Sequence, residues 1–356
     1  MLLISAISLG LLGTMARPSL LRQRRITPML VTFALVLIAF VAVLASALAF
    51  GGPRDIAPLA SVNNPFEKVD FSRVPPAQRY TARDGTPLAW YGYAPAPGAT
   101  AEGAPVRRVV LVHGSSSRAR SLHVLASALA AQGHAVAALD MRGHGESGPR
   151  GHVAYIGQLE DDVEDFLNAM PHAGPQTLMG FSAGGGFALR FAGDDRQARF
   201  DHYVLLSPFI HQDAPTARPN TGGWAAVGVP RLIALTLLNR AGITQWNHLP
   251  VVRFALDDAS RAGLTPSYSY NLAMNFRPQL NYASNIRHAR GSVCVVVGQD
   301  DELFDADRYA ELFAQAGKPV PVTLVPGVNH MGLTLDAQAV AAVARHACQA
   351  NEAIDG

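Results

Sequence analysis

The sequence predicts an α/β protein: a mostly parallel, doubly wound sheet with an inserted helical lid, preceded by an apolar N-terminal segment. Three observations lead to this fold class. Short apolar runs typical of strands alternate with helix-like stretches from about residue 79 to residue 347. This alternation stops between residues 210 and 284, and the 22 residues Met29–Phe50 contain no charge. Alternating strands and helices favour a parallel sheet, and a long insertion after a strand predicts a lid over the strand ends.

Size and composition exclude several classes of protein. With 356 residues, 49% of them hydrophobic, the chain can bury one large core or two modest ones. The formal net charge is only +2, which gives no electrostatic footprint for nucleic acid. Cys294 and Cys348, the two cysteines, cannot make a disulfide framework or a four-cysteine zinc site. We expect two buried apolar side chains, or a single bridge if the domain is exported.

The uncharged segment Met29–Phe50 is long enough to cross a membrane, at about 33 Å as a helix. Arg22, Arg24 and Arg25 precede it, so the positive-inside rule puts the amino end in the cytoplasm and the rest outside. Ala47-Leu48-Ala49 also resembles a signal-peptidase site. The alternatives are therefore a membrane anchor, or a secreted or periplasmic protein cleaved near Ala49. In both, the main domain is outside the cytoplasm.

These features divide the chain into three parts. Residues 1–50 are a cytoplasmic tail with an anchor or signal sequence, and the first residue is either Met1 or Met15. Residues 51–76 contain Pro and Asn with little periodicity, which is typical of a linker. Residues 77–356 form the α/β domain, with the lid insertion at about 210–284.

The elements of the α/β domain follow from their apolar patterns. An Asp84-Gly85 turn separates the first two strands. The expected strands are 79–82, 87–93, 108–113, 134–141, 176–181, 202–207, 293–297 and 320–325. The expected helices are 121–132, 158–170, 185–191, 305–316 and 337–347.

A candidate nucleophile lies between one of these strands and the helix after it. The motif Gly180-Phe-Ser182-Ala-Gly184 joins the apolar run 176–181 to the helical stretch 185–191. In a strand–turn–helix context, this pattern is typical of a nucleophile elbow, a turn so sharp that the residues two before and two after the serine must lack a side chain.

With this elbow, three further motifs resemble the α/β-hydrolase superfamily, and most closely the serine hydrolases typified by monoacylglycerol lipases and lysophospholipases. The resemblance covers about residues 79–347. Its motifs follow in the expected order: Val112-His113-Gly114-Ser115, Asp140-Met-Arg-Gly-His144-Gly-Glu-Ser147, the elbow at Ser182, and the pair Gly298-Gln-Asp-Asp301 with Gly327-Val-Asn-His330.

The resemblance implies a catalytic triad. Ser182 is the expected nucleophile and His330 the expected base, because the superfamily order is Ser, acid, His and a histidine best activates a serine near neutral pH. Asp300, Asp301 and Asp305 all follow the strand 293–297. The family's usual spacing selects Asp301 as the acid that orients the histidine, with Asp300 as the main alternative.

An oxyanion hole needs two backbone N–H groups near the nucleophile. Ala183, at the start of the helix, supplies one, and the resemblance implies Ser115 for the other. Members of the family often carry a glycine where this chain has Ser116, so the sequence does not fix the backbone conformation of this loop. The resemblance gives His113 and His144 structural roles.

The lid insertion carries Trp224 and an apolar run that includes Leu235, which are candidates for binding the substrate's acyl chain. The alternative is that these side chains only pack on the core. No metal site is expected, because no H-E-x-x-H motif or His/Cys cluster is present. No dinucleotide motif opens the first helix either, and no cofactor is expected.

We therefore expect a serine hydrolase that cleaves carboxylic esters through an acyl-enzyme. The resemblance implies a small-molecule or lipid ester as substrate, such as a monoacylglycerol or lysophospholipid, and the apolar segment implies a membrane. One alternative is an acyltransferase or thioesterase with the same triad, because the shape of the lid and pocket decides which acceptor takes the acyl group. Another is a non-catalytic binding module, which a missing triad residue would favour.

Overall fold

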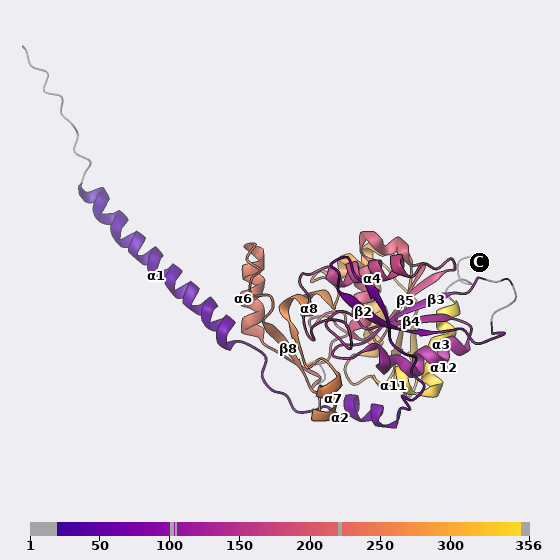
Figure 1. Ribbon diagram of the computed structural model, residues 1–356. Helices are drawn as coiled ribbons and strands as arrows, with labels where there is room; N and C mark the ends of the chain where they lie inside the picture. The colour runs from indigo at the N-terminus through magenta and orange to yellow at the C-terminus, as the bar shows by residue number, and fades with distance from the viewer. Residues whose placement is uncertain (1–19, 100–102, 104, 220–222, 350–356) are drawn as a thin grey trace, which may run out of the picture.

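The computed structural model describes residues 20–99, 103, 105–219 and 223–349, with side chains from residue 28 to residue 345. An eight-stranded sheet forms its centre (Figure 1). From edge to edge its strands are β1 (Gln78–Thr81), β2 (Pro87–Tyr93), β4 (Ala135–Leu139), β3 (Arg108–Val112), β5 (Gln176–Phe181), β6 (His202–Leu206), β10 (Ser292–Gly298) and β11 (Val322–Val325).

Most of this sheet is parallel, as predicted. Strand β2 runs antiparallel to both of its neighbours, and all pairs from β4 to β11 are parallel. All five residues of the central strands β3 and β6 are buried, because helices cover both faces of the sheet. The predicted fold class is confirmed, and the bounds of β2 and β5 are those predicted.

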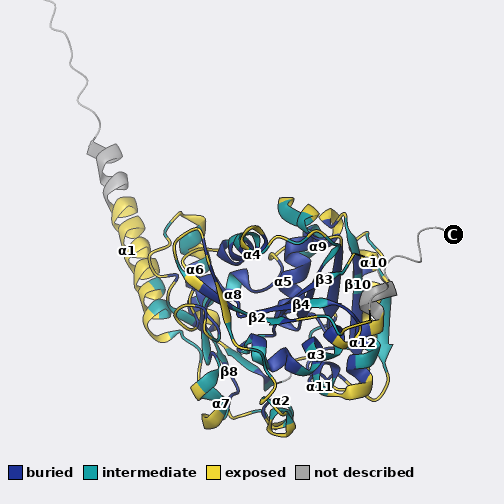
Figure 2. Ribbon diagram, turned by 45° about the vertical axis from the view of Figure 1, so that its right-hand side comes forward, coloured by how far each residue is buried: buried dark blue, intermediate teal, exposed yellow. Residues whose placement is uncertain are grey.

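The helices form one layer on each face of the sheet (Figures 1 and 2). One layer holds α3 (His123–Ala131), α11 (Gly332–Leu335) and α12 (Ala337–Gln349). The other holds α4 (Gln158–Ala169), α5 (Ala183–Ala192) and α9 (Tyr282–His288), and Figure 2 shows α10 (Tyr309–Gln315) near β10. Figure 2 shows the buried residues concentrated in the sheet and in the helix faces that touch it.

The lid insertion contains a small antiparallel sheet as well as helices. Strands β7 (Ala225–Val227), β8 (Pro250–Phe254) and β9 (Ser267–Ser269) pair in that order. Around them lie the helices α6 (Val229–Arg240), α7 (Asp258–Gly263) and α8 (Tyr270–Asn275). Helix α9, whose start falls inside the predicted insertion, packs on α5 and belongs to the core.

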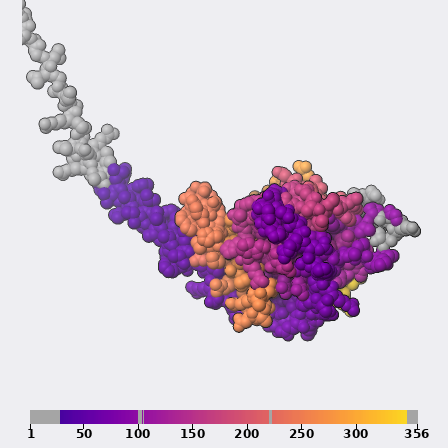
Figure 3. All heavy atoms as spheres, in the orientation of Figure 1, coloured from indigo at the N-terminus to yellow at the C-terminus, as the bar shows by residue number. Residues whose placement is uncertain are grey.

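Helix α1 (Leu20–Phe50) extends from the body of the protein (Figures 1 and 3). Its segment Pro28–Phe50 has a mean hydropathy of 2.8 and is long and apolar enough to cross a membrane. The most apolar 18 residues of this segment are not buried in the protein. A helix that is apolar on all sides and unburied is not part of a soluble core. Its inner end contacts the lid at α6.

The segment expected to be a linker, residues 51–76, is folded against the lid and the α/β core. It contains α2 (Ala60–Asn63) followed by a 3₁₀ helix, Asn64–Lys68. The Leu59 N–H donates to the Ala255 carbonyl at 2.9 Å, and the Asn63 amide donates to the same carbonyl at 2.9 Å. We call residues 59–68 the connector. Its apolar residues are too few to give a periodic pattern, so this packing was not predictable from spacing.

Candidate active site

Ser182 lies on a strained turn between β5 and α5. Its φ is 56° and its ψ is −118°, a backbone conformation that residues other than glycine rarely adopt. The two motif glycines permit this turn. A Cβ at Gly180 would lie 2.0 Å from the Gly184 carbonyl oxygen, and a Cβ at Gly184 would lie 2.4 Å from the His113 carbonyl oxygen. The elbow predicted from the motif is therefore present.

Asp301 and His330 form a buried pair. Asp301 follows β10 and His330 follows β11, so two parallel strand ends bring them together. The Asp301 carboxylate lies 2.8 Å from His330 Nδ1, through Oδ2. Its other oxygen accepts hydrogen bonds from the N–H groups of Leu303 and Phe304, both at 2.9 Å. The alternative acid, Asp300, is exposed.

This environment keeps the Asp301 carboxylate ionised. Burial alone would raise the pKa of Asp301, but the charge and hydrogen bond of His330 and the backbone N–H of Phe304 outweigh burial and lower it below its usual value. An ionised Asp301 accepts a hydrogen bond from Nδ1–H of His330. When the ring is neutral, this bond holds its one proton on Nδ1, so Nε2 carries the lone pair and is the atom that can act as a base.

The His330 ring is held by aromatic packing as well as by Asp301. Its centroid lies 4.7 Å from that of Phe181 and 5.3 Å from that of Phe304. The backbone N–H of His330 donates a hydrogen bond to the Glu302 carboxylate at 3.0 Å. Glu302 has no counterpart in the sequence motifs, so this second carboxylate contact was missed.

A small, partly open cavity is lined by four of the predicted residues. Ser182, His330, Ser115 and Trp224 all line it, and its volume is about 40 Å³. Pockets that hold drug-sized ligands span about 300–1,000 Å³, so a long acyl chain requires this cavity to widen. The other lining residues are mostly apolar or small: Val62, Asn63, Phe66, Gly114, Ser116, Ser117, Phe181, Leu256, Ser260, Leu264, Leu303 and Met331.

Leu235 is not among the residues that line this cavity. It is completely buried on α6, inside the lid core. Sequence spacing identified an apolar helix correctly, but it could not tell which helix face meets a substrate. The residues that sequence reasoning missed are Val62 and Phe66 of the connector and Leu256 and Leu264 of the lid.

The two expected oxyanion donors belong to two segments next to Ser182, the start of α5 and the loop after β3. Ala183 is the first residue of α5, so its N–H is among those that a helix leaves without an intrahelical acceptor. Ser115 follows Gly114, where an added Cβ would lie 3.2 Å from the Ser182 Cβ. The Ser115 hydroxyl accepts a hydrogen bond from the Trp224 indole at 2.8 Å.

His113 and His144 are buried beside this site but do not line the cavity. Burial lowers the pKa of His113 to about 4, and burial lowers the pKa of His144 well below its usual value. Both rings are therefore neutral near pH 7. His113 Nδ1 lies 2.8 Å from the Gly114 carbonyl oxygen, and His113 Nε2 accepts from the Met141 N–H at 3.2 Å. They hold the loops around Ser182.

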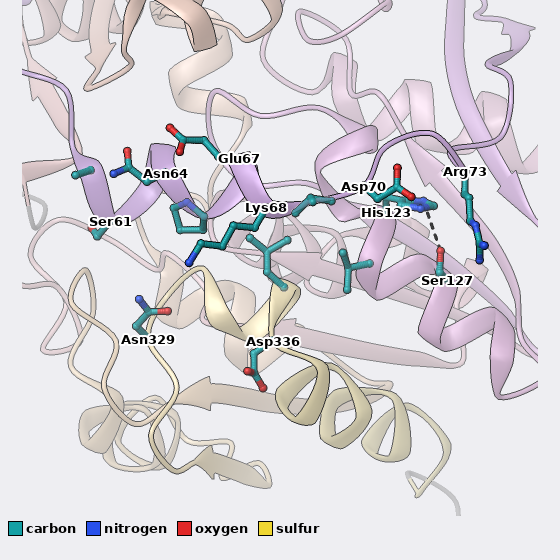
Figure 4. A pocket seen from close by; sticks show the side chains of 15 residues that line it. Ser61, Asn64, Glu67, Lys68, Asp70, Arg73, His123, Ser127, Asn329 and Asp336 are labelled. Atoms are coloured by element: carbon teal, nitrogen blue, oxygen red, sulfur yellow. Dashed lines mark hydrogen bonds between the residues drawn. The ribbon is translucent and has the colours of Figure 1, made fainter.

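A larger open groove of about 1,090 Å³ lies on the other side of the connector (Figure 4). Its walls carry exposed charges from the connector, and Lys68 extends into it. Ser182 and His330 are not among its lining residues. Among the residues that the structure describes, no three His, Cys, Asp or Glu side chains cluster as metal ligands would.

The chain is similar to known proteins in sequence and in fold. The family model described as serine aminopeptidase, S33 (Hydrolase_4) matches residues 103–336. A monoacylglycerol lipase of Mycolicibacterium smegmatis is 34% identical over 109 residues, which is 29% of this chain and 38% of that protein. The chain thus aligns with well under half the length of this curated relative.

Two solved structures share the fold. A soluble variant of the monoglyceride lipase from Saccharomyces cerevisiae superposes with a TM-score of 0.59 at 20% identity, covering 79% of this chain and 96% of that one. A membrane phospholipase A superposes with a TM-score of 0.52 at 16% identity, covering 91% of this chain and 96% of that one.

Proposed function

Because this chain belongs to the serine aminopeptidase S33 family of α/β-hydrolases, we propose that it is a serine hydrolase that cleaves carboxylic esters of lipids through an acyl-enzyme. The observation that carries the proposal is the buried Asp301–His330 pair, because His330 lines the same cavity as Ser182 on its strained elbow. A nucleophile, a base and a group that orients the base are the elements that acyl transfer needs.

We propose the following reaction for these residues. Nε2 of His330 takes the proton of the Ser182 hydroxyl as its oxygen attacks the ester carbonyl. The N–H groups of Ser115 and Ala183 stabilise the negative oxygen of the tetrahedral intermediate. His330 then gives its proton to the departing alcohol, leaving an ester on Ser182. A water molecule, deprotonated by His330, cleaves this ester, releases the acid and restores the serine.

A lipid ester is the substrate class that the surroundings favour. The cavity is walled by Leu256, Leu264, Leu303 and Met331, which suit an acyl chain rather than a charged group. By their names, the monoacylglycerol lipase and the phospholipase to which the chain is similar act on monoacylglycerols and on phospholipids. We therefore propose a monoacylglycerol or a lysophospholipid as substrate.

Labelling the purified protein with a fluorophosphonate, followed by a screen of p-nitrophenyl esters and monoacylglycerols, tests this function. We expect covalent labelling and release of the acid. Activity on thioesters alone, or acyl transfer to an alcohol in preference to water, would favour the thioesterase or acyltransferase alternative. Absence of both labelling and turnover would favour a binding module.

Acyl-chain selectivity is expected to depend on Leu264, which lines the cavity from the lid. Each buried methylene contributes about 0.8 kcal/mol, so kcat/KM should rise roughly fourfold per added carbon until the space is full. Leu264→Ala should flatten this rise in a series of p-nitrophenyl esters. Trp224→Ala should flatten it too, with an added loss of turnover because the indole also bonds Ser115.

Leu235→Ala is the matched control for this series. Leu235 is a lid leucine that is completely buried and does not line the cavity. We expect a loss of about 2–5 kcal/mol in unfolding free energy and an unchanged chain-length profile. If Leu264→Ala keeps the wild-type profile, the acyl chain binds elsewhere.

We also propose that α1 is an uncleaved membrane anchor with the hydrolase domain outside. The Arg231 guanidinium, on α6, supports this. It donates to the carbonyls of Leu48, Ala49 and Pro250 at 2.8, 3.0 and 2.9 Å. Cleavage after Ala49 would remove two of these three acceptors from a buried arginine.

The anchor predicts that the protein fractionates with membranes and that its amino terminus lies before residue 29. Membrane fractionation with amino-terminal sequencing measures both. Met1 and Met15, the two possible first residues, lie outside the described residues. A soluble form that begins at Phe50 would show cleavage instead, and a cytoplasmic protein would contradict export altogether.

A further inference from the structure

The lid contacts the loop next to the expected oxyanion hole at Ser115, through Trp224, and most extensively at Ser116. All three polar groups of Ser116 bond to the lid. Its N–H donates to the Tyr268 hydroxyl at 2.6 Å, and its own hydroxyl donates to the Thr265 carbonyl at 2.7 Å. Its carbonyl accepts from the Thr265 N–H at 2.8 Å. Ser116, Thr265 and Tyr268 are all buried.

This attachment matters because the loop is strained at the same residue. Ser116 has a φ of 66°, one of three positive values among the non-glycine residues that the structure describes. A side chain in this region costs free energy and persists only where its surroundings hold it. The neighbouring Ser115, whose N–H is the proposed oxyanion donor, therefore depends on contacts that come from the lid.

The Tyr268 hydroxyl also links this loop to His144. A phenol has one proton, and since the Tyr268 oxygen accepts from Ser116, its own O–H donates to His144 Nε2, 2.6 Å away. His144 Nδ1 lies 3.2 Å from the carbonyl oxygens of Met141 and Arg142, to which it donates. The chain of bonds runs from the Ser116 N–H through Tyr268 and His144 to the loop after β4.

We propose that Tyr268 is a positioning residue for the reaction: through Ser116, it sets the direction of the Ser115 N–H toward the oxyanion. This inference rests on the proposed function. The Ser116 N–H is already occupied by Tyr268, so it is not available to substrate, and the Ser115 N–H is left as the donor from this loop. Trp224, also from the lid, fixes the Ser115 side chain.

The lid then covers the active site and also helps to set its catalytic geometry. If the lid moves outward to admit a long acyl chain, its hydrogen bonds to Ser116 lengthen and the Ser115 N–H no longer points at the oxyanion. The N–H regains its direction when the lid closes and Thr265 and Tyr268 bond Ser116 again. Turnover is thereby tied to a closed lid, because an N–H group must point at the developing charge to stabilise it.

Tyr268→Phe tests the proposal, because it removes only the hydroxyl and keeps the ring packed against Phe254 and Phe276. Removing one oxyanion donor costs about 10²–10³ in kcat, so misdirecting one should cost about 10- to 100-fold. We expect this loss in kcat for a short p-nitrophenyl ester with little change in KM. The inhibition constant of a trifluoromethyl ketone, whose adduct with Ser182 carries an oxyanion, should rise by a similar factor.

Tyr270→Phe is the matched control. Tyr270 is also a buried lid tyrosine, but its hydroxyl lies 3.2 Å from the Thr236 hydroxyl, within the lid. We expect its kcat to remain within about twofold of wild type. Equal losses in both variants, or an unchanged kcat and inhibition constant in Tyr268→Phe, would overturn the positioning role.

Ser116→Ala provides a second variant should Tyr268→Phe fail to fold. It removes the hydroxyl bond to Thr265 and keeps the N–H bond to Tyr268, so we expect a smaller fall in kcat, of several-fold, again at constant KM; an unchanged kcat would count against the proposal. Failure of the proposed function would look different, because the wild-type protein would then show neither ester turnover nor fluorophosphonate labelling.

Discussion

Ser182→Ala is expected to abolish ester hydrolysis and fluorophosphonate labelling while leaving the fold intact. The hydroxyl is the group that forms the acyl-enzyme, and loss of a triad nucleophile lowers kcat by about 10⁶-fold in serine hydrolases. Alanine keeps the Cβ, so the elbow at φ 56° is no more strained than before. Turnover of a p-nitrophenyl ester, gel labelling and thermal unfolding measure the three parts of this prediction.

Ser127→Ala is a suitable control for that variant. Ser127 lies on α3 and lines the open groove on the far side of the connector, away from the Ser182 cavity. Its replacement should leave labelling and turnover unchanged. Persistent labelling of the Ser182→Ala protein would show that another residue is the nucleophile.

Asp301→Asn should lower kcat by about 10⁴. The amide is nearly isosteric, and Oδ1 can still accept from the N–H groups of Leu303 and Phe304. The group facing His330 Nδ1 then becomes an NH₂, which is a donor. It favours the tautomer with the proton on Nε2, so His330 cannot accept the proton of Ser182.

Asp300→Asn is the matched comparison, since this neighbouring carboxylate is exposed and only its backbone N–H is engaged, with the Val328 carbonyl at 3.0 Å. We expect kcat within about twofold of wild type. Steady-state kinetics of both variants, with thermal unfolding to check their folds, decides between the two acids. A larger loss in Asp300→Asn would transfer the orienting role to that residue.

The core of the fold was predictable because its signal is local. Strands buried on both faces are continuous apolar runs, and helices between them repeat their apolar residues with a helical period. The strand Gln176–Phe181 and its elbow therefore have the predicted bounds. Candidate site residues that sit at strand ends, such as Asp301 and His330, could be placed together because parallel strands end on one edge of the sheet.

The walls of the cavity were not predictable, because they depend on contacts between distant segments. Val62 and Phe66 reach the cavity from a segment whose sequence resembles a linker. Tyr268 meets Ser116 across 152 positions of the chain. Leu235 is the reverse case: we expected it to bind the acyl chain, but it lies on a lid helix and faces the lid core instead of the cavity.

The bonds from Arg231 to the end of α1 have a consequence for how this enzyme would meet its substrate. If α1 stays in the bilayer, the lid is held beside the membrane surface and cannot diffuse away between turnovers. The relevant concentration is then the number of substrate molecules per unit area of membrane, not per volume of solution. Diluting the vesicles would leave the rate per enzyme unchanged, whereas diluting the substrate with inert lipid would lower it.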